Sequence, residues 1–166
     1  MNSRLLYSVG LSVAIFASVG ADLKSDWQKI LDNYCSVAKK KDIKKAEAIV
    51  RANFDKNFKF VDAKGNSMGL DEWIKQGNDE MKATGSVSAF SIHIDSAKQT
   101  GSSADMMTTI TFGAMIKMNP KAKPSEMKYV GKSVMSVAKK GNKWWITKIV
   151  ETSSKMTLGG KPFNGG

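Results

Sequence analysis

The chain has 166 residues with one cysteine, and its 26 lysines and arginines exceed its 15 acidic residues to give a formal net charge of +11. A single cysteine excludes an internal disulfide, so packing alone must hold the fold together. Because nearly all the basic residues are lysines, the composition favours a solvated surface, with loose attraction to an anionic envelope surface at most, over specific nucleic-acid recognition.

The first 21 residues have the pattern of a secretory signal peptide. Arg4 supplies a positive start, Leu5–Val19 form a mostly apolar run that is short for a membrane span, and the small residues Gly20 and Ala21 precede the polar Asp22. We predict cleavage after Ala21 and a secreted or periplasmic mature protein. The alternative is an uncleaved membrane anchor.

Three helices are predicted in the first half of the mature chain. The first carries an apolar stripe at steps of three and four along one face. Asp42 is typical of an N-cap for the second helix, and the third helix follows Gly69 and ends at Thr84-Gly85. Between the second and third helices, Asp62-Ala-Lys-Gly65 predicts a turn after a short extended segment. The stripe of the first helix consists of Leu23, Trp27, Ile30, Leu31, Tyr34, Cys35 and Ala38.

After Gly85 the hydrophobic period changes from 3.6 to 2, which is typical of half-buried strands. A turn at Lys139–Lys143 joins the last two predicted strands as a hairpin. Helices followed by consecutive hairpins predict an α+β domain with an antiparallel sheet that helices cover on one face. We expect one domain over residues 22–156 and a flexible glycine-rich tail over 157–166. The predicted strands cover residues 90–94, 106–118, 127–138 and 144–152.

Four short motifs occur in an order typical of one superfamily. They are the link from Tyr34 to Asp42-Ile43, Phe60-Val61-Asp62-x-x-Gly65, Leu70-Asp-Glu-Trp73, and Gly141-Asn-Lys-Trp144-Trp-Ile146. Over about residues 22–155 the chain resembles the nuclear-transport-factor-2-like (NTF2-like, or SnoaL-like) superfamily, which includes ketosteroid isomerases and SnoaL-type cyclases. The resemblance implies a cone-shaped, cystatin-like fold, with three N-terminal helices packed on a curved antiparallel sheet around a cavity. It also implies a homodimer that pairs through the outer face of the sheet.

The resemblance to ketosteroid isomerases implies candidate catalytic residues. In those enzymes an aspartate moves a proton, while a tyrosine and a protonated carboxylic acid stabilise the enolate oxygen. Tyr34 matches the tyrosine and Asp62 matches the aspartate, whereas the segment Met127–Ala138 contains no acid for the third position. Both residues also have a structural interpretation. Tyr34 lies on the apolar stripe of the first helix, and aspartate is favoured at the head of an Asp-x-x-Gly turn.

His93 is the only histidine and a third candidate catalytic residue. Its strand phase groups it with Ser91 and Asp95, so that it lies either on the solvated outer face or at the cavity wall. At the cavity wall it could share acid and base work with Asp62, because the unperturbed pKa of histidine is about 6.5. A lone histidine without further ligands predicts no metal site, and the lack of a phosphate-binding loop predicts no cofactor.

Aromatic side chains indicate what the cavity would hold. Trp27, Trp73 and Tyr34 are candidate ligand-binding residues for a small apolar molecule, although the tryptophans would serve equally well as core or interface anchors. The strand methionines fit an adaptable pocket or a core. The sequence therefore favours an exported, non-enzymatic domain that binds a small ligand or acts as an accessory. The alternative is an isomerase, dehydratase or cyclase that acts by proton transfer in the cavity, so whether the protein is an enzyme stays open.

Overall fold

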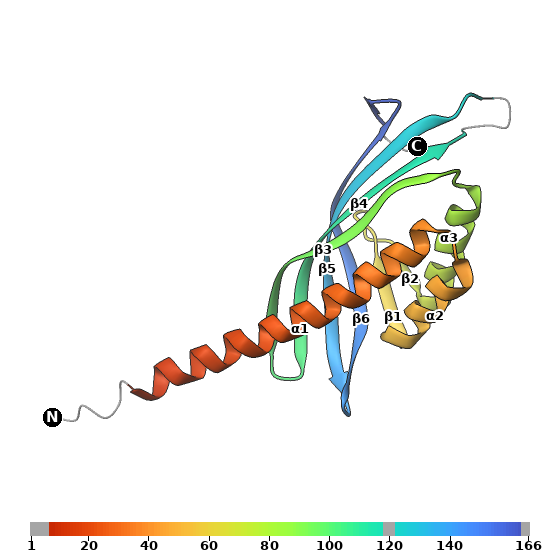
Figure 1. The fold of residues 1–166 in the computed structure, drawn as a ribbon. Coiled ribbons are helices and arrows are strands. Elements are labelled where there is room, and N and C mark those ends of the chain that lie inside the picture. Colours follow the sequence, from red (N-terminus) through yellow and green to blue (C-terminus); the bar gives the residue numbers. More distant parts are fainter. Residues whose placement is uncertain (1–6, 118–121, 164–166) are drawn as a thin grey trace.

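The structure, a computed structural model, describes residues 7–117 and 122–163, with side chains from residue 22 onward. Within these ranges the chain forms three helices and seven strands (Figure 1). Two short strands lie between the second and third helices, and four long strands follow the third helix. The elements are α1 (Tyr7–Lys39), α2 (Ile43–Asn53), β1 (Phe54–Val61), β2 (Ser67–Gly69), α3 (Leu70–Ala83), β3 (Val87–Thr100), β4 (Ser103–Ile116), β5 (Ser125–Lys140), β6 (Lys143–Leu158) and β7 (Lys161–Pro162).

The strands form one curved sheet in the order β2-β1-β6-β5-β4-β3, with β7 paired to β6 (Figure 1). α1 packs mainly against β3, and α3 packs against β1. The predicted α+β class, three helices on a curved sheet, is confirmed. The sheet is mixed rather than wholly antiparallel, because β1 enters beside β6 and runs parallel to it.

The first helix begins earlier than its apolar stripe indicated. α1 starts at Tyr7 and continues to Lys39, so the predicted cleavage site after Ala21 lies within its length. In Figure 1 the N-terminal part of α1 projects beyond the sheet. Arg4 and the side chains of residues 7–21 lie outside the described part of the chain. Within the described part, no helix holds an apolar stretch long enough to span a membrane. Export and cleavage stay predictions.

The helix ends follow the local signals of the sequence. Asp42 is the N-cap of α2, and its carboxylate accepts a hydrogen bond from the backbone N of Lys45 at 3.2 Å. This bond satisfies one of the amide groups that have no partner within the first turn of a helix. α3 ends at Ala83 with Thr84 as its C-cap. Both predicted boundaries are confirmed.

The hydrophobic core fills the space between the helices and the inner face of the sheet. Trp27 of α1, Phe58 of β1 and Met106 of β4 are at most 2% exposed. Fully burying side chains of this size contributes about 1.5–3 kcal/mol each, so this cluster is the main source of stability. Its buried members are Leu23, Trp27, Leu31, Val50, Phe54, Phe58, Ile74, Ile94, Ala104, Met106, Met135, Val137 and Ile146.

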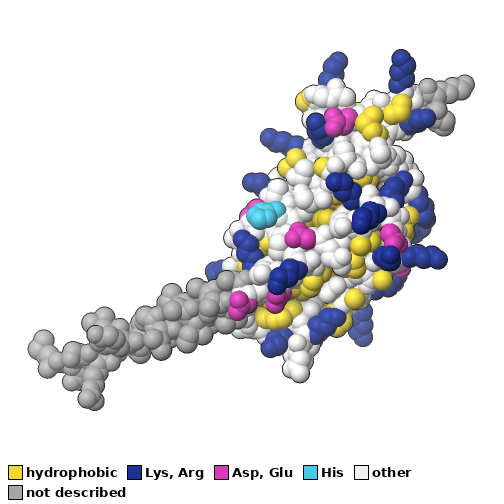
Figure 2. Space-filling view, viewed as in Figure 1, with side chains coloured by type: hydrophobic (Ala, Val, Ile, Leu, Met, Phe, Trp, Pro, Cys, Tyr) yellow, Lys and Arg dark blue, Asp and Glu magenta, His cyan; other side chains and the backbone are white. Residues whose placement is uncertain are grey.

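Charged side chains cover the outside of the molecule. On the face shown in Figure 2, lysines are dispersed and acidic side chains lie among them. Asp55 is a buried acid, whose side chain is 8% exposed and pairs with Lys140. Lys140, and then the Asn57 amide at 2.9 Å, lower the pKa of Asp55 and offset the burial of its charge. This pair ties the start of β1 to the end of β5.

The last long strand extends past the predicted Thr152 to Leu158. Gly159 and Gly160 then form a turn with φ of 57° and 79°, a backbone conformation that glycine adopts without steric cost. β7 folds back on β6 after this turn, with Leu158 opposite Lys161. Residues 164–166, the end of the predicted tail, lie outside the described part.

α1 satisfies part of the free edge of β3. β3 is the last strand of the sheet, so the backbone groups that point away from β4 lack a strand partner. The Gln28 side chain donates to the Ile92 carbonyl oxygen and accepts from the Ile94 amide, both at 2.8 Å. One side chain thus satisfies two edge groups and fixes α1 against the sheet.

Replacing Gln28 by alanine removes the partners of the Ile94 amide and the Ile92 carbonyl. We predict a loss of about 1–3 kcal/mol in the free energy of unfolding, measured by urea denaturation. Lys29→Ala is the matched control, because the ion pair of Lys29 is with the exposed Asp26, and its expected effect is below about 1 kcal/mol. Equal stability of the two variants would show that the edge contact does not hold α1 in place.

Candidate functional site

The Asp62 carboxylate is engaged by its own turn, between β1 and β2. Oδ1 accepts hydrogen bonds from the backbone N of Lys64 at 2.9 Å and of Asn66 at 2.8 Å, and Oδ2 accepts from Asn66 Nδ2 at 2.8 Å. These donors, chiefly the Asn66 side chain, lower the pKa of Asp62. A carboxylate with a lowered pKa is a weaker base. The contacts correspond to the turn interpretation of this residue.

Tyr34 projects from α1 onto β3. Its ring packs edge-on against Phe90, with ring centroids 5.8 Å apart and planes at 72°. Burial raises the pKa of Tyr34 to about 12, with smaller contributions from the Cys35 thiol and the Glu80 carboxylate. The phenol therefore stays protonated at neutral pH and can act as a hydrogen-bond donor.

The other predicted site residues have structural surroundings of their own. His93 is exposed on β3 opposite Thr109, while its neighbours Ile92 and Ile94 pack toward the core. Of the two positions expected for His93, the structure shows the one on the outer face. Trp27 is 2% exposed in the core. Trp73 is half-buried on α3 and stacks on Phe54, with ring centroids 5.2 Å apart.

No hydrogen bond or ion pair among the described residues joins Tyr34, Asp62 and His93 to one another. In the same residues no group of three histidine, cysteine, aspartate or glutamate side chains is placed to hold a metal ion. A catalytic role for the three predicted residues stays a prediction.

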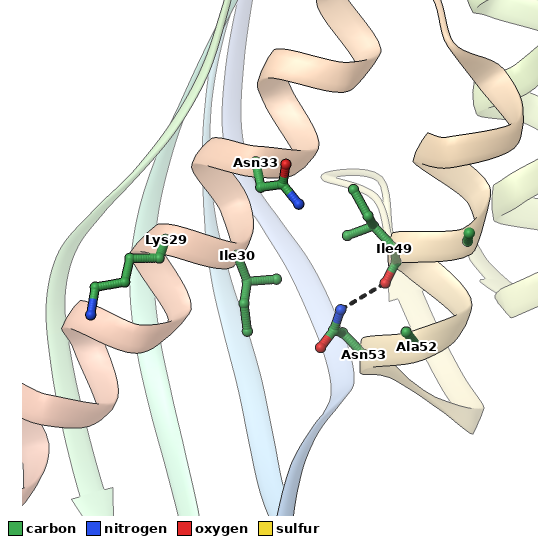
Figure 3. A pocket seen from close by; sticks show the side chains of 7 residues that line it. Lys29, Ile30, Asn33, Ile49, Ala52 and Asn53 are labelled. Carbon is green, nitrogen blue, oxygen red and sulfur yellow. Dashed lines mark hydrogen bonds between the residues drawn. The ribbon is translucent and has the colours of Figure 1, made fainter.

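Two surface grooves lie along the helices. One, of about 400 Å³, runs between α1 and α2, and Figure 3 shows Ile30 and Ile49 pointing into it. Asn53, at its edge, donates to the Ile49 carbonyl oxygen at 2.8 Å and is thus engaged within α2. The other, of about 470 Å³, lies on α3 and is lined mostly by charged and polar side chains. Neither groove is the space between helices and sheet that the resemblance implies.

One row of polar side chains crosses the inner face of the sheet. Cross-strand partners point to the same side of a sheet, and the register pairs Thr108 with Ser133 and Ser133 with Glu151. The hydroxyl oxygens of Thr108 and Ser133 lie 2.7 Å apart, and both residues are buried. Beyond this row the inner face becomes largely half-buried. The next two rows are Ile92, Ile110, Gly131 and Ser154, and then Phe90, Phe112, Tyr129 and Met156.

Tyr129 lies back over Gly131 and reaches Glu151, and we call these three residues the Tyr129 site. The Tyr129 hydroxyl donates to Glu151 Oε1 at 3.0 Å. A methyl group on residue 131 would lie 2.7 Å from Tyr129 Cζ and 2.8 Å from Cε1, which is closer than carbon atoms approach. Glycine at this position therefore makes room for the ring. Burial, then the negative charge of Glu151, raises the pKa of Tyr129 to about 12.

Glu80 of α3 is an exposed acid in the groove on α3 whose charge also affects the tyrosines of the inner face. Its carboxylate accepts from Gln76 Nε2 at 2.8 Å. Its charge contributes to the raised pKa of both Tyr34 and Tyr129.

The Tyr129 site was not predicted from the sequence. The third acid was expected within residues 127–138, whereas the structure brings Glu151 from the neighbouring strand. The alternation of Tyr129, Gly131 and Ser133 was a readable signal that these residues share one face. The inward direction of Glu151 had no such signal, because it depends on the register between β5 and β6.

Comparisons with known proteins identify the fold. No protein-family model and no curated protein matches the chain. A conserved protein of known structure from Planctomyces limnophilus superposes with a TM-score of 0.62 at 8% identity, over 78% of this chain and 93% of that one. An NTF2-like superfamily protein from Salmonella enterica superposes with a TM-score of 0.58 at 15% identity, over 79% of this chain and 90% of that one.

A third similar structure is a candidate scytalone dehydratase from Novosphingobium aromaticivorans. Its TM-score is 0.54 at 11% identity, over 76% of this chain and 81% of that one. At these identities the likeness concerns the fold and not the activity. The chain has the NTF2-like fold, as the sequence resemblance implied.

Replacing Glu151 by glutamine removes its charge and keeps an acceptor for the Tyr129 hydroxyl. A negative neighbour disfavours the phenolate, so we predict that the pKa of Tyr129 falls from about 12 toward the usual value of about 10. NMR titration of tyrosine Cζ resonances measures this change. Tyr34 is the internal control, because the causes of its raised pKa do not include Glu151. An unchanged Tyr129 pKa would contradict the contact.

Proposed function

We propose that this NTF2-like domain binds a small, largely apolar molecule at the half-buried end of its inner sheet face, with the Tyr129 site as the polar contact. The observation that carries the proposal is the hydrogen bond from Tyr129 to Glu151 on a face that is otherwise mostly apolar. Small-ligand sites typically combine apolar walls with a few polar groups that fix orientation.

The apolar part of the proposed site comes from side chains that the core leaves incompletely covered. Phe90, Ile110, Phe112 and Met156 are each only partly buried on the same face as Tyr129. A ligand that covers them would gain about 25 cal/mol for each Å² of apolar surface removed from water. Their partial exposure therefore supports an apolar binding partner.

A non-enzymatic role is the first candidate because Asp62, the predicted base, is engaged by its turn. An isomerase, dehydratase or cyclase is the second candidate. It is favoured by the Tyr129 site, in which a phenol and a carboxylate meet on the inner face and would suit proton transfer. A co-purified molecule recovered unchanged after incubation supports the first candidate, and conversion that requires Glu151 would select the second.

We also propose export after cleavage at Ala21 and pairing of two copies through the outer sheet face. Met107 and Val130 on that face are 43% and 45% exposed. The register places Met107, Val134 and Val150 in one apolar row across three strands. Native mass spectrometry of the purified protein counts the subunits, gives the mass after any cleavage, and detects a co-purified molecule in one spectrum.

Gly131→Ala tests the proposed site directly, because the added methyl group must displace the Tyr129 ring. We predict that binding of the neutral apolar dye Nile red, followed by fluorescence titration, weakens about five- to tenfold, the usual scale for one hydrogen bond and its geometry. Lys132→Ala is the control, since Lys132 is an exposed residue on the outer face of the same strand. Equal dye affinity of the two folded variants would place the dye elsewhere and overturn the proposed site.

A further inference from the structure

Four aromatic side chains form a row from α1 across the sheet to β5. The ring centroids of Tyr34 and Phe90 lie 5.8 Å apart, and those of Phe90 and Phe112 lie 5.5 Å apart with planes at 88°. Phe112 of β4 is the cross-strand partner of Tyr129 on β5. Aromatic ring faces carry partial negative charge and attract cations. The row can therefore attract a cation as well as an apolar group.

The Glu151 carboxylate lies at this row, and neither Glu151 nor the exposed Glu80 of α3 has an ion-pair partner in the part of the chain that the structure describes. Glu151 accepts from the Tyr129 hydroxyl, and Glu80 accepts from the Gln76 amide. The ion pairs among the described residues involve other acids. This is notable in a chain with a net charge of +11, where lysines are abundant.

One lysine near the C-terminal end of α3, Lys41, is engaged by backbone carbonyl groups. Lys41 Nζ donates to the carbonyl oxygen of Thr84 at 2.6 Å and of Gly85 at 3.5 Å, at the end of the helix. Cations are favoured there, because carbonyl groups at the C-terminus of a helix carry partial negative charge. Lys41 therefore has a structural role at the C-terminus of α3.

We propose that the ligand of the inner face carries a positively charged ammonium group, which lies against the aromatic row beside Glu151. This inference rests on the proposed function and adds the charge of the ligand to it. The ring faces and the Glu151 carboxylate attract the same group, and the apolar part of the ligand covers Phe112 and its neighbours. Aromatic ring faces recognise quaternary ammonium ligands in this way.

The electrostatic setting of the tyrosines agrees with this assignment. Glu80 raises the pKa of both Tyr34 and Tyr129, and Glu151 adds to the effect at Tyr129. A negative potential that disfavours a phenolate favours a cation at the same place. The overall positive charge of the chain opposes nonspecific cation binding, so any cation preference must come from the site itself.

The test compares two probes of the same shape that differ in charge, choline and the neutral 3,3-dimethylbutan-1-ol, each titrated into the full chain by two-dimensional NMR. Choline is expected to bind roughly tenfold more tightly than the neutral probe, which is within the range of cation–aromatic and ion-pair contacts. Choline is also expected to shift the amide signals of Gly131 and Ser154. Glu151→Gln should remove most of this preference. Glu126→Gln, which changes an acid paired with Lys128, should leave it intact.

The possible results distinguish the ammonium assignment from the apolar ligand site on which it rests. Equal binding of both probes at the inner face would overturn the ammonium assignment and leave the apolar ligand site standing. The ammonium assignment and the apolar ligand site would both be overturned if neither probe bound and the Gly131→Ala variant still bound Nile red with unchanged affinity. If Glu151→Gln does not fold, Phe112→Leu provides the second variant, because it removes a ring of the row and keeps an apolar side chain. An undiminished choline preference there would likewise contradict the assignment.

Discussion

The register between β5 and β6 is the constraint on which the candidate site depends. Counting outward from the turn at Gly141-Asn142, a regular hairpin would pair Ser133 with Val150 and point Glu151 to the outer face. A register shift between Ser136 and Val137 changes this, and Ser133 pairs with Glu151 instead. An extra residue in one strand moves the following side chains to the opposite face. The carboxylate thereby reaches the inner face.

The inner face then separates into two functional parts. At one end α1, α2 and α3 cover it, and Met106, Met135 and Ile146 pack there as a closed core. At the other end the side chains are only partly covered, and Gly131 leaves the space that Tyr129 fills. Stability and recognition thus come from one face of one sheet. The binding end can vary in its polar groups without disturbing the core.

Local patterns predicted the elements of this fold, and tertiary relations limited what else could be predicted. The Asp42 cap, the Asp62 turn and the period-2 strands were readable because each depends on neighbouring residues. The parallel pairing of β1 with β6 joins segments about ninety residues apart and leaves no local trace. Tyr34 became a candidate through the resemblance to ketosteroid isomerases, and its place on an apolar stripe predicted that it packs against the sheet. Glu151 was missed because one register shift between β5 and β6, invisible in the hydrophobic pattern, decides which way its side chain points.

The most direct test of this account is the set of cross-strand nuclear Overhauser effects between β5 and β6 in the isotope-labelled protein. The account predicts backbone contacts that pair Ser133 with Glu151 and Gly131 with Ser154. Contacts that pair Ser133 with Val150 instead, as in a hairpin without bulges, would place Glu151 outside and contradict it.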